Sequence, residues 1–164
     1  LNNDILNILK TIPWFLELKT PQLKKLAEIS SIESVAAGQV LFKEGDREDN
    51  IYLILEGQME LCMRIPNQGE QCTYVAEPLD VVGWSSLTPV VRQRISTVRA
   101  LQPTRLLVLE SDSLRRICDE DHDLGYIIMR RVANVVASRL LTMRLHMLET
   151  LVQREASRRP LTME

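Results

Sequence analysis

The sequence predicts a mainly β protein with flanking helices (α+β): an antiparallel jelly-roll barrel of about eight short strands, N-terminal helices and a long C-terminal helix. Three observations support this prediction. Residues 32–110 contain short apolar runs that alternate with polar residues and stop at glycine or proline. Helical periodicity is confined to the segments before and after that region. The 164 residues are 45% apolar with no shift in composition, which favours one domain with a core of ordinary size.

The N-terminal part, residues 2–30, is predicted to be helical. Its first helix has one apolar face, formed by Ile5, Leu6, Leu9 and Ile12. Pro13 ends that face, and a second helix is expected to begin with Thr20 as its N-cap and Pro21 in its first turn.

After the strands, Ser111 is predicted to be the N-cap of a short helix. A long helix is then expected to begin at Asp121 or Asp123 and to continue to about Arg154. We therefore expect a single domain over residues 1–155. Within it the barrel covers about 32–110 and the long helix about 121–154, and residues 156–164 form a tail.

A loop around Gly83 has the features of an anion-binding site. The apolar run before it stops at Gly83, and residues 84–87 can form one helical turn whose backbone N–H groups point outward. Arg94 follows shortly before a strand-like segment, and its planar set of donors suits a phosphate. Arg92 is near enough to share this role. Taken alone, a glycine and an arginine at this spacing are weak evidence and favour a surface turn with a solvated arginine.

The upstream segment, residues 38–61, adds short alternating strands broken at Gly45-Asp46 and Glu56-Gly57. Together with the Gly83 loop it resembles the cyclic nucleotide-binding domain of the catabolite activator protein family. That family has turns of the form G-x-x-[IL]-x-x-x-G-[DE] and G-x-[VM]-x-[LV], followed by a phosphate-binding cassette. The cassette opens with Phe-Gly-Glu-[LI]-[AG]-Leu and closes with Arg-x-Ala-Thr-Val. Here residues 82–87 read Val-Gly-Trp-Ser-Ser-Leu and residues 94–98 read Arg-Ile-Ser-Thr-Val. The resemblance spans roughly residues 12–152.

The resemblance implies a ligand-sensing regulatory domain that binds a cyclic nucleotide such as cAMP or cGMP, or a related phosphate-bearing small molecule. This chain departs from the family at Trp84, where the family has a glutamate that accepts a hydrogen bond from the ribose. An indole donates but does not accept, so the ligand is either recognised differently or absent. The alternative is a degenerate domain of the same fold that dimerises constitutively without nucleotide. The ligand-binding residues expected from the loop and from the resemblance are Gly83, Trp84, Ser85, Ser86, Arg92, Arg94, Ile95, Ser96, Thr97, Met143 and Arg144.

The long helix carries a seam with the 4-3 spacing of a coiled coil, formed by Met129, Ala133, Val136, Leu140, Met143 and Met147. A second apolar stripe is formed by Leu141, Leu145, Leu148 and Val152. Two stripes on one helix predict contact with both the barrel and a partner. The alternative is a single wide face covered by the chain's own core. In the resembling family this helix forms a parallel homodimer and covers the base of the ligand, which implies base contacts at Met143 and Arg144.

Composition and charge also argue against several classes of function. The net charge of −2 with no basic run argues against nucleic-acid binding, and the absence of a long apolar run argues against a membrane span. Cys62, Cys72 and Cys118 have no C-x-x-C spacing, so idle thiols in a cytoplasmic protein are expected, with neither a metal nor a disulfide. No catalytic constellation is visible, so an enzyme is not expected.

Overall fold

The chain opens with α1 (Asn2–Thr11), the 3₁₀ helix η1 (Pro13–Phe15) and α2 (Thr20–Glu28). The computed structural model describes residues 2–47, 49–88 and 93–158. The helical prediction for the N-terminal part is confirmed, but the N-cap of α2 is Lys19 and not Thr20. The carbonyl of Lys19 accepts the first helical bond, from the N–H of Leu23 at 3.0 Å, so Thr20 already belongs to the helix.

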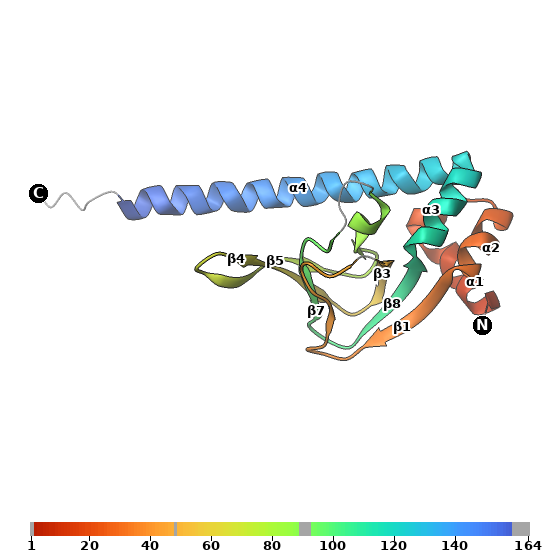
Figure 1. Cartoon of the computed structure of the whole chain (residues 1–164), viewed down its shortest axis with the longest axis horizontal. Coiled ribbons are helices and arrows are strands. Elements are labelled where there is room, and N and C mark those ends of the chain that lie inside the picture. Colours follow the sequence, from red (N-terminus) through yellow and green to blue (C-terminus); the bar gives the residue numbers. More distant parts are fainter. Residues whose placement is uncertain (1, 48, 89–92, 159–164) are drawn as a thin grey trace, which may run out of the picture.

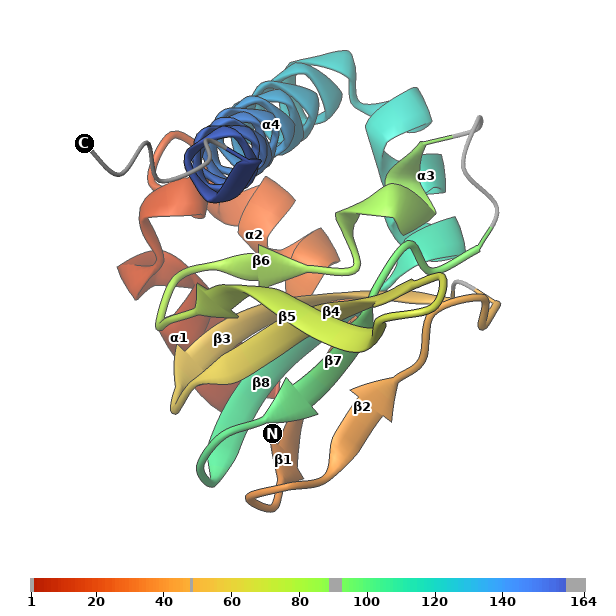
Figure 2. The same cartoon turned by 90° about the vertical axis from the view of Figure 1, so that its left-hand side faces the viewer.

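Eight strands follow, all paired antiparallel, and they form two four-stranded sheets with the orders β1-β8-β3-β6 and β2-β7-β4-β5. The strands are β1 (Ser30–Val35), β2 (Val40–Phe42), β3 (Asn50–Glu56), β4 (Met59–Ile65), β5 (Gly69–Ala76), β6 (Val81–Val82), β7 (Thr97–Ala100) and β8 (Thr104–Glu110). The sheets face each other in Figure 2, with the helices beyond the first sheet and α4 across one end.

The predicted closed jelly-roll barrel is wrong, although the mainly antiparallel β class with flanking helices is confirmed. Among the described strands, no ladder joins one sheet to the other. The edge strands β2 and β6 have only three and two residues, which is too short to complete a continuous ring of hydrogen bonds.

Two central strands, β3 and β8, are apolar on both faces because each lies between two cores. In β3, Ile51 and Leu53 face the helices, whereas Tyr52 and Ile54 face the second sheet. Residues 106–109 of β8 alternate in the same way. Side chains on a strand point alternately to its two sides, so a strand buried on both sides reads as a continuous apolar run.

Strand β8 leads into α3 (Ser111–Glu120), whose N-cap is Glu110 and not the predicted Ser111. The Glu110 carboxylate accepts from the N–H groups of Asp112 at 3.0 Å and Ser113 at 2.7 Å, and the bonds from Ser113 lower its pKa. Ser111 is the first helical residue, and its hydroxyl donates to Ser86 Oγ at 2.7 Å. This bond ties the start of α3 to the candidate anion loop.

The long helix α4 (His122–Arg158) begins where it was predicted and extends slightly further. Asp121 caps it, since Asp121 Oδ1 accepts from Leu124 N at 3.0 Å. Its first turns bury Leu124, Ile128 and Val132 against the helix-side core. The remainder crosses the end of the sheets and continues past the tip of the β4–β5 hairpin (Figure 1). No helix within the described ranges is long and apolar enough to cross a membrane.

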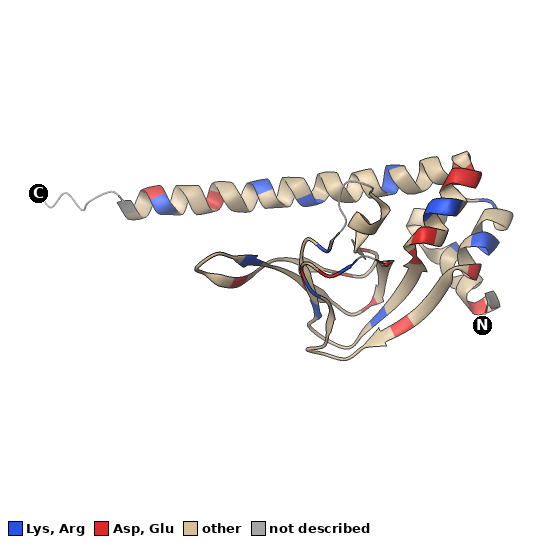
Figure 3. Ribbon diagram, in the orientation of Figure 1, with Lys and Arg blue, Asp and Glu red and all other residues tan. Residues whose placement is uncertain are grey.

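Beyond residue 139, neither predicted apolar stripe of α4 packs into either hydrophobic core of the domain. Leu140, Met143 and Met147 of the first stripe are exposed, and so are the four residues of the second stripe. Leu124, Ile128 and Val132, earlier in the helix, pack instead into the core between the first sheet and the helices. The distal half of α4 also carries charged residues of both signs, spaced along the helix among the apolar ones (Figure 3). Apolar side chains on the distal half of α4 are therefore left uncovered by the part of the chain that the structure describes.

Candidate functional site

A cavity of about 90 Å³ lies between η2 (Trp84–Leu87), the second sheet and α4. None of the described residues that line it is an aspartate or a glutamate. Two arginines line it, Arg94 from the segment before β7 and Arg139 from α4. The other lining residues are apolar or carry hydroxyl groups: Phe42, Leu61, Met63, Thr73, Tyr74, Val82, Gly83, Trp84, Ser85, Ile95, Ser96, Val98, Thr142 and Met143. The cavity is therefore apolar and positively charged, a setting that favours an anionic ligand with an apolar part.

The backbone around Arg94 is held by the turn that precedes β3. The N–H of Gly45 donates to the carbonyl of Arg94 at 2.8 Å, and the N–H of Arg94 donates to the carbonyl of Asp46 at 2.9 Å. Asp46 Oδ2 in turn accepts from the N–H of Lys43 at 2.8 Å, which closes the turn. The upstream Gly45-Asp46 motif thus positions the arginine of the cassette, although the two are far apart in sequence.

The Arg94 side chain is buried, with 4% of its surface exposed. Its Nη1 donates to the Gly83 carbonyl at 3.1 Å and its Nη2 donates to the Asn50 carbonyl at 2.7 Å. The guanidinium carbon lies 4.2 Å from the centroid of the Phe42 ring, within range of a cation–π interaction. These contacts fix the plane of the guanidinium at the wall of the cavity.

Gly83 is required by this arrangement. Its φ is +75°, and a Cβ built at this position would lie 2.5 Å from Arg94 Nη1 and 3.0 Å from the Asn50 carbonyl oxygen. Only glycine adopts this conformation without strain and leaves room for the guanidinium. The Gly83 carbonyl also accepts from Ser86 Oγ at 2.8 Å, which stabilises the turn of η2.

Trp84, at the position that departs from the family motif, is half-buried and lines the cavity. It also packs against the helix-side core. An indole at this point presents a flat apolar surface and one N–H donor, where a glutamate presents a charged acceptor.

Helix α4 supplies the opposite wall through Arg139, Thr142 and Met143. The guanidinium carbon of Arg139 lies 3.2 Å from the centroid of the Tyr74 ring. Burial lowers the pKa of Arg139 to about 10, because the charged form is poorly hydrated there. Arg139 and Thr142 were not predicted from the sequence. Arg139 could have been found from Met143, because a residue four positions earlier lies on the same face of a helix.

Seven of the predicted ligand-binding residues meet around this cavity. They are Gly83, Trp84, Ser85, Arg94, Ile95, Ser96 and Met143. Three others do not line it. Ser86 is buried and bonded to Gly83 and Ser111, Thr97 Oγ1 accepts from the N–H of Glu44 at 3.0 Å, and Arg144 is exposed. Arg92 lies outside the described residues.

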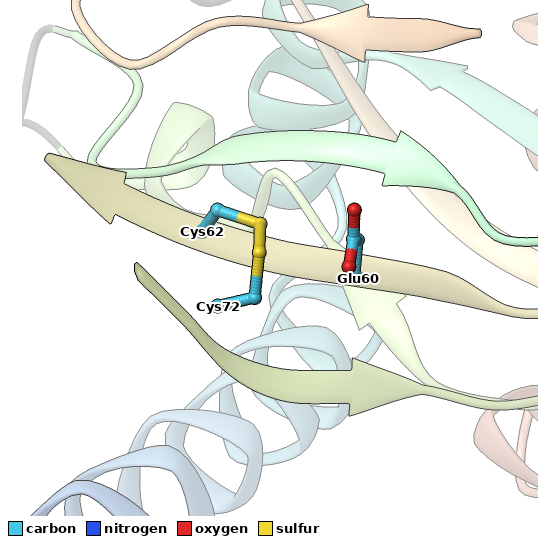
Figure 4. A group of neighbouring side chains, drawn as sticks. All are labelled: Glu60, Cys62 and Cys72. Atoms are coloured by element: carbon cyan, nitrogen blue, oxygen red, sulfur yellow. A yellow bond between two sulfur atoms is a disulfide. The ribbon is translucent and has the colours of Figure 1, made fainter. Parts of the chain in front are cut away.

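Cys62 and Cys72 form a disulfide between neighbouring positions of β4 and β5 (Figure 4), so the expectation of idle thiols is wrong for this pair. Strand pairing brings the two side chains together, which their sequence separation of 10 does not reveal. Glu60 lies near the two sulfurs, but its carboxylate pairs with Arg99 at 2.9 Å. With the sulfurs bonded to each other, this group does not offer a metal site. Cys118 is a free thiol, and burial raises its pKa to about 11.

A family model for the cyclic nucleotide-binding domain matches residues 32–121, which include both strand motifs and the Gly83–Arg94 cassette. The chain belongs to the cyclic nucleotide-binding domain family. Domains of this family are generally regulatory rather than catalytic.

Several relatives share this cyclic nucleotide-binding domain. A putative cyclic nucleotide-binding protein from Geobacter metallireducens is 32% identical, with a TM-score of 0.72 over 82% of this chain and 96% of that one. The regulatory domain of Toxoplasma gondii PKA, solved with cAMP, has the same fold at 17% identity, with a TM-score of 0.68 over 81% of this chain and 50% of that one. The neuropathy target esterase sws of Drosophila grimshawi is 27% identical over 148 residues, which are 84% of this chain. The match covers only 10% of the esterase, so it concerns the nucleotide-binding region alone.

Proposed function

We propose that this domain senses a cyclic nucleotide, cAMP or cGMP, or a related phosphate-bearing small molecule, which binds in the cavity between Gly83, Arg94 and α4. The observation that carries the proposal is the buried guanidinium of Arg94 at a cavity whose described lining has no carboxylate. A phosphate there gains a charge-assisted contact in a region of low polarity, where such contacts are strongest. The cAMP found with the Toxoplasma regulatory domain supports the same class of ligand for this fold.

The ribose and base are expected to lie against the apolar part of the cavity. Trp84 offers a stacking surface, and the hydroxyl groups of Ser85 and Ser96 lie along the same wall. Thr142 and Met143 would cover the base from α4. Arg144 lies outside the cavity and has no part in this proposal.

We propose that α4 transmits ligand binding to a partner protein. Met143 lines the cavity and also belongs to the exposed seam of the helix. A ligand beneath Met143 therefore changes the packing of the residue that a partner helix would contact. We propose that the partner is a second copy of the chain, in the cytoplasm, because a self-complementary seam closes into a two-fold dimer. Contacts between the two copies are expected at the seam residues Met129, Ala133, Val136, Leu140, Met143 and Met147.

A thermal-shift panel of cAMP, cGMP and cyclic dinucleotides tests the ligand class. A ligand at about 100 times its Kd stabilises the folded state by about 2.7 kcal/mol. For a domain of this size that raises the Tm by about 5 to 10 °C. Arg94→Ala is expected to abolish the shift, whereas Arg154→Ala, on the exposed end of α4, is expected to leave it unchanged.

Arg92 is close enough in sequence to share the phosphate, so the Arg92→Ala/Arg94→Ala pair is measured beside the single variant. An unchanged shift in both would contradict the cassette assignment. If none of the nucleotides shifts the Tm of the parent protein, the chain is instead the constitutive interaction module of the same fold.

A further inference from the structure

Arg139 holds a positive charge that the fold leaves without a counter-ion. Its Nε is buried, and no described residue accepts a hydrogen bond from its guanidinium or pairs with it as a carboxylate. Its contact is instead with the face of the Tyr74 ring. A buried charge without an anionic partner is costly, and a bound anion would remove that cost.

Other arginines nearby are engaged differently. Arg131, two turns earlier on α4, donates to Glu17 Oε1 at 2.7 Å and to the Pro13 carbonyl at 3.4 Å. Arg99 on the neighbouring sheet pairs with Glu60 and Glu70. Arg94 is held by the carbonyls of Gly83 and Asn50. Arg139 differs from all three because its described contact is with an aromatic face, and neither the Asp80 carboxylate nor any other described oxygen pairs with its guanidinium.

The space around Arg139 continues beyond the candidate site. A second cavity of about 210 Å³ lies on the other side of Arg139 and Tyr74, which line both cavities. Its α4 wall is one face of the helix, formed by Arg131, Asn134, Val135, Ser138 and Arg139. Opposite lie Trp14 and Asp80. The Asp80 carboxylate accepts from the Tyr74 hydroxyl at 2.9 Å and from the N–H of Glu77 at 3.0 Å.

We propose that the ligand carries two anionic groups, one at Arg94 and the other at Arg139, with the second cavity receiving the second group. This inference rests on the proposed function and names a narrower class of ligand, a nucleotide with two separate phosphodiesters such as a cyclic dinucleotide. A cyclic mononucleotide has one charge, and with its phosphate at Arg94 it would supply no anion to the half-buried Arg139. Asn134 and Ser138 add neutral donors beside the second group.

Isothermal titration with cGMP and with cyclic di-GMP tests this inference on the whole chain. The variants are Arg139→Gln, Arg139→Lys and Arg94→Ala, with Arg154→Gln as the matched control on the exposed end of the same helix. Arg139→Gln is expected to weaken cyclic di-GMP about tenfold or more, the cost of losing a charged hydrogen-bond partner, and to change cGMP less than about twofold. Arg139→Lys should recover part of the loss, and Arg94→Ala should weaken both ligands. Circular dichroism of each variant establishes that it is folded.

The outcomes separate this inference from the proposed function. If cGMP binds through Arg94 but cyclic di-GMP binds no better, or is indifferent to Arg139→Gln, the second anionic group is ruled out while the proposed function survives. An equal loss for both ligands in Arg139→Gln would mean that Arg139 contacts a group common to both, which also overturns the inference. If neither ligand nor any other cyclic nucleotide binds the parent protein, the proposed function itself fails.

Discussion

The guanidinium of Arg139 lies over the ring of Tyr74, with its central carbon 3.2 Å from the centroid of the ring. This contact joins the only long helix of the described chain to β5 at the mouth of the candidate site. The ring partly replaces the water that the cation loses on burial, but an aromatic face is a weaker partner than a carboxylate. The arrangement suits a residue that contributes to ligand binding at some expense of stability.

Arg139→Met is therefore expected to stabilise the unliganded protein. The folded pKa of Arg139, about 10, is below the ordinary value of an arginine, so between these two values the unfolded chain binds more protons than the folded one. The penalty is fully present below pH 10 and is relieved as the pH rises above it. Allowing for the lost cation–π contact, removal of the charge should raise the free energy of unfolding at pH 7 by about 1 kcal/mol. Urea denaturation measures this, with Arg154→Met as the control. A loss of stability would show that Tyr74 fully compensates the charge.

Gly83→Ala is expected to lower both stability and ligand affinity. The left-handed conformation costs alanine about 1 to 2 kcal/mol, and the new methyl group displaces the Arg94 guanidinium from its carbonyl partners. Gly38→Ala is a matched control, because Gly38 has a φ of +79° with nothing within 4 Å of the added Cβ. It should lose stability but keep its affinity. Equal affinity in the two variants would mean that Arg94 does not depend on the space at Gly83.

Trp84→Glu is expected to improve affinity for a ribose-bearing cyclic nucleotide, because it introduces the acceptor that the family motif has at this position. One hydrogen bond to the ribose corresponds to about 1 to 3 kcal/mol, or roughly a ten- to a hundredfold change in Kd. Titration of cAMP and cGMP measures the effect, and Trp84→Ala controls for loss of the ring alone. Weaker binding in the Glu variant than in the parent would favour the indole as a stacking contact for a different ligand.

Reduction of Cys62–Cys72 is expected to destabilise the β4–β5 hairpin. Opening a bridge between residues 10 apart in sequence costs about 2 to 3 kcal/mol. Leu61, Met63, Thr73 and Tyr74, which flank the two cysteines, all line the cavity, so ligand affinity should fall as well. The Tm is measured with and without dithiothreitol, beside a Cys62→Ser/Cys72→Ser variant that should not respond. Three free thiols in the purified, unreduced protein would contradict the bridge.

Leu140→Asp is expected to convert a dimer to a folded monomer. Leu140 is 68% exposed, and a two-fold dimer would place a desolvated charge in both copies of the seam. Sedimentation velocity gives the oligomeric state. Leu101→Asp is the control, since Leu101 is also exposed, at 45%, but lies in the turn between β7 and β8 and not on the seam. A parent protein that is monomeric at tens of micromolar would overturn the dimer.

The local features of the fold could be predicted from the sequence because they depend on residues close together in the chain. Alternating apolar residues and glycine breaks predicted the strands, and helical periodicity predicted α1, α2 and α4. Gly83 and Arg94 were recognised because the backbone conformation and the charged donor each require one residue type. The N-cap of α3 could not be predicted in this way, because the side chains of Glu110 and Ser111 can each accept hydrogen bonds from N–H groups at the start of the helix. In the structure the Ser111 hydroxyl bonds to Ser86, and Glu110 is the cap.

Features that join distant segments required the tertiary structure. The bridge between Cys62 and Cys72 depends on the register of β4 and β5, and the open sheets depend on edges too short to close. Arg139 reads in the sequence as one more arginine on a helix, because its burial and its lack of a carboxylate arise only where α4 crosses Tyr74. The sequence by itself thus determined the strands, the helices and the turn at Gly83, whose causes are local. Only the tertiary structure decided which charges are compensated, because hydration and pairing depend on neighbours that the chain brings together by folding.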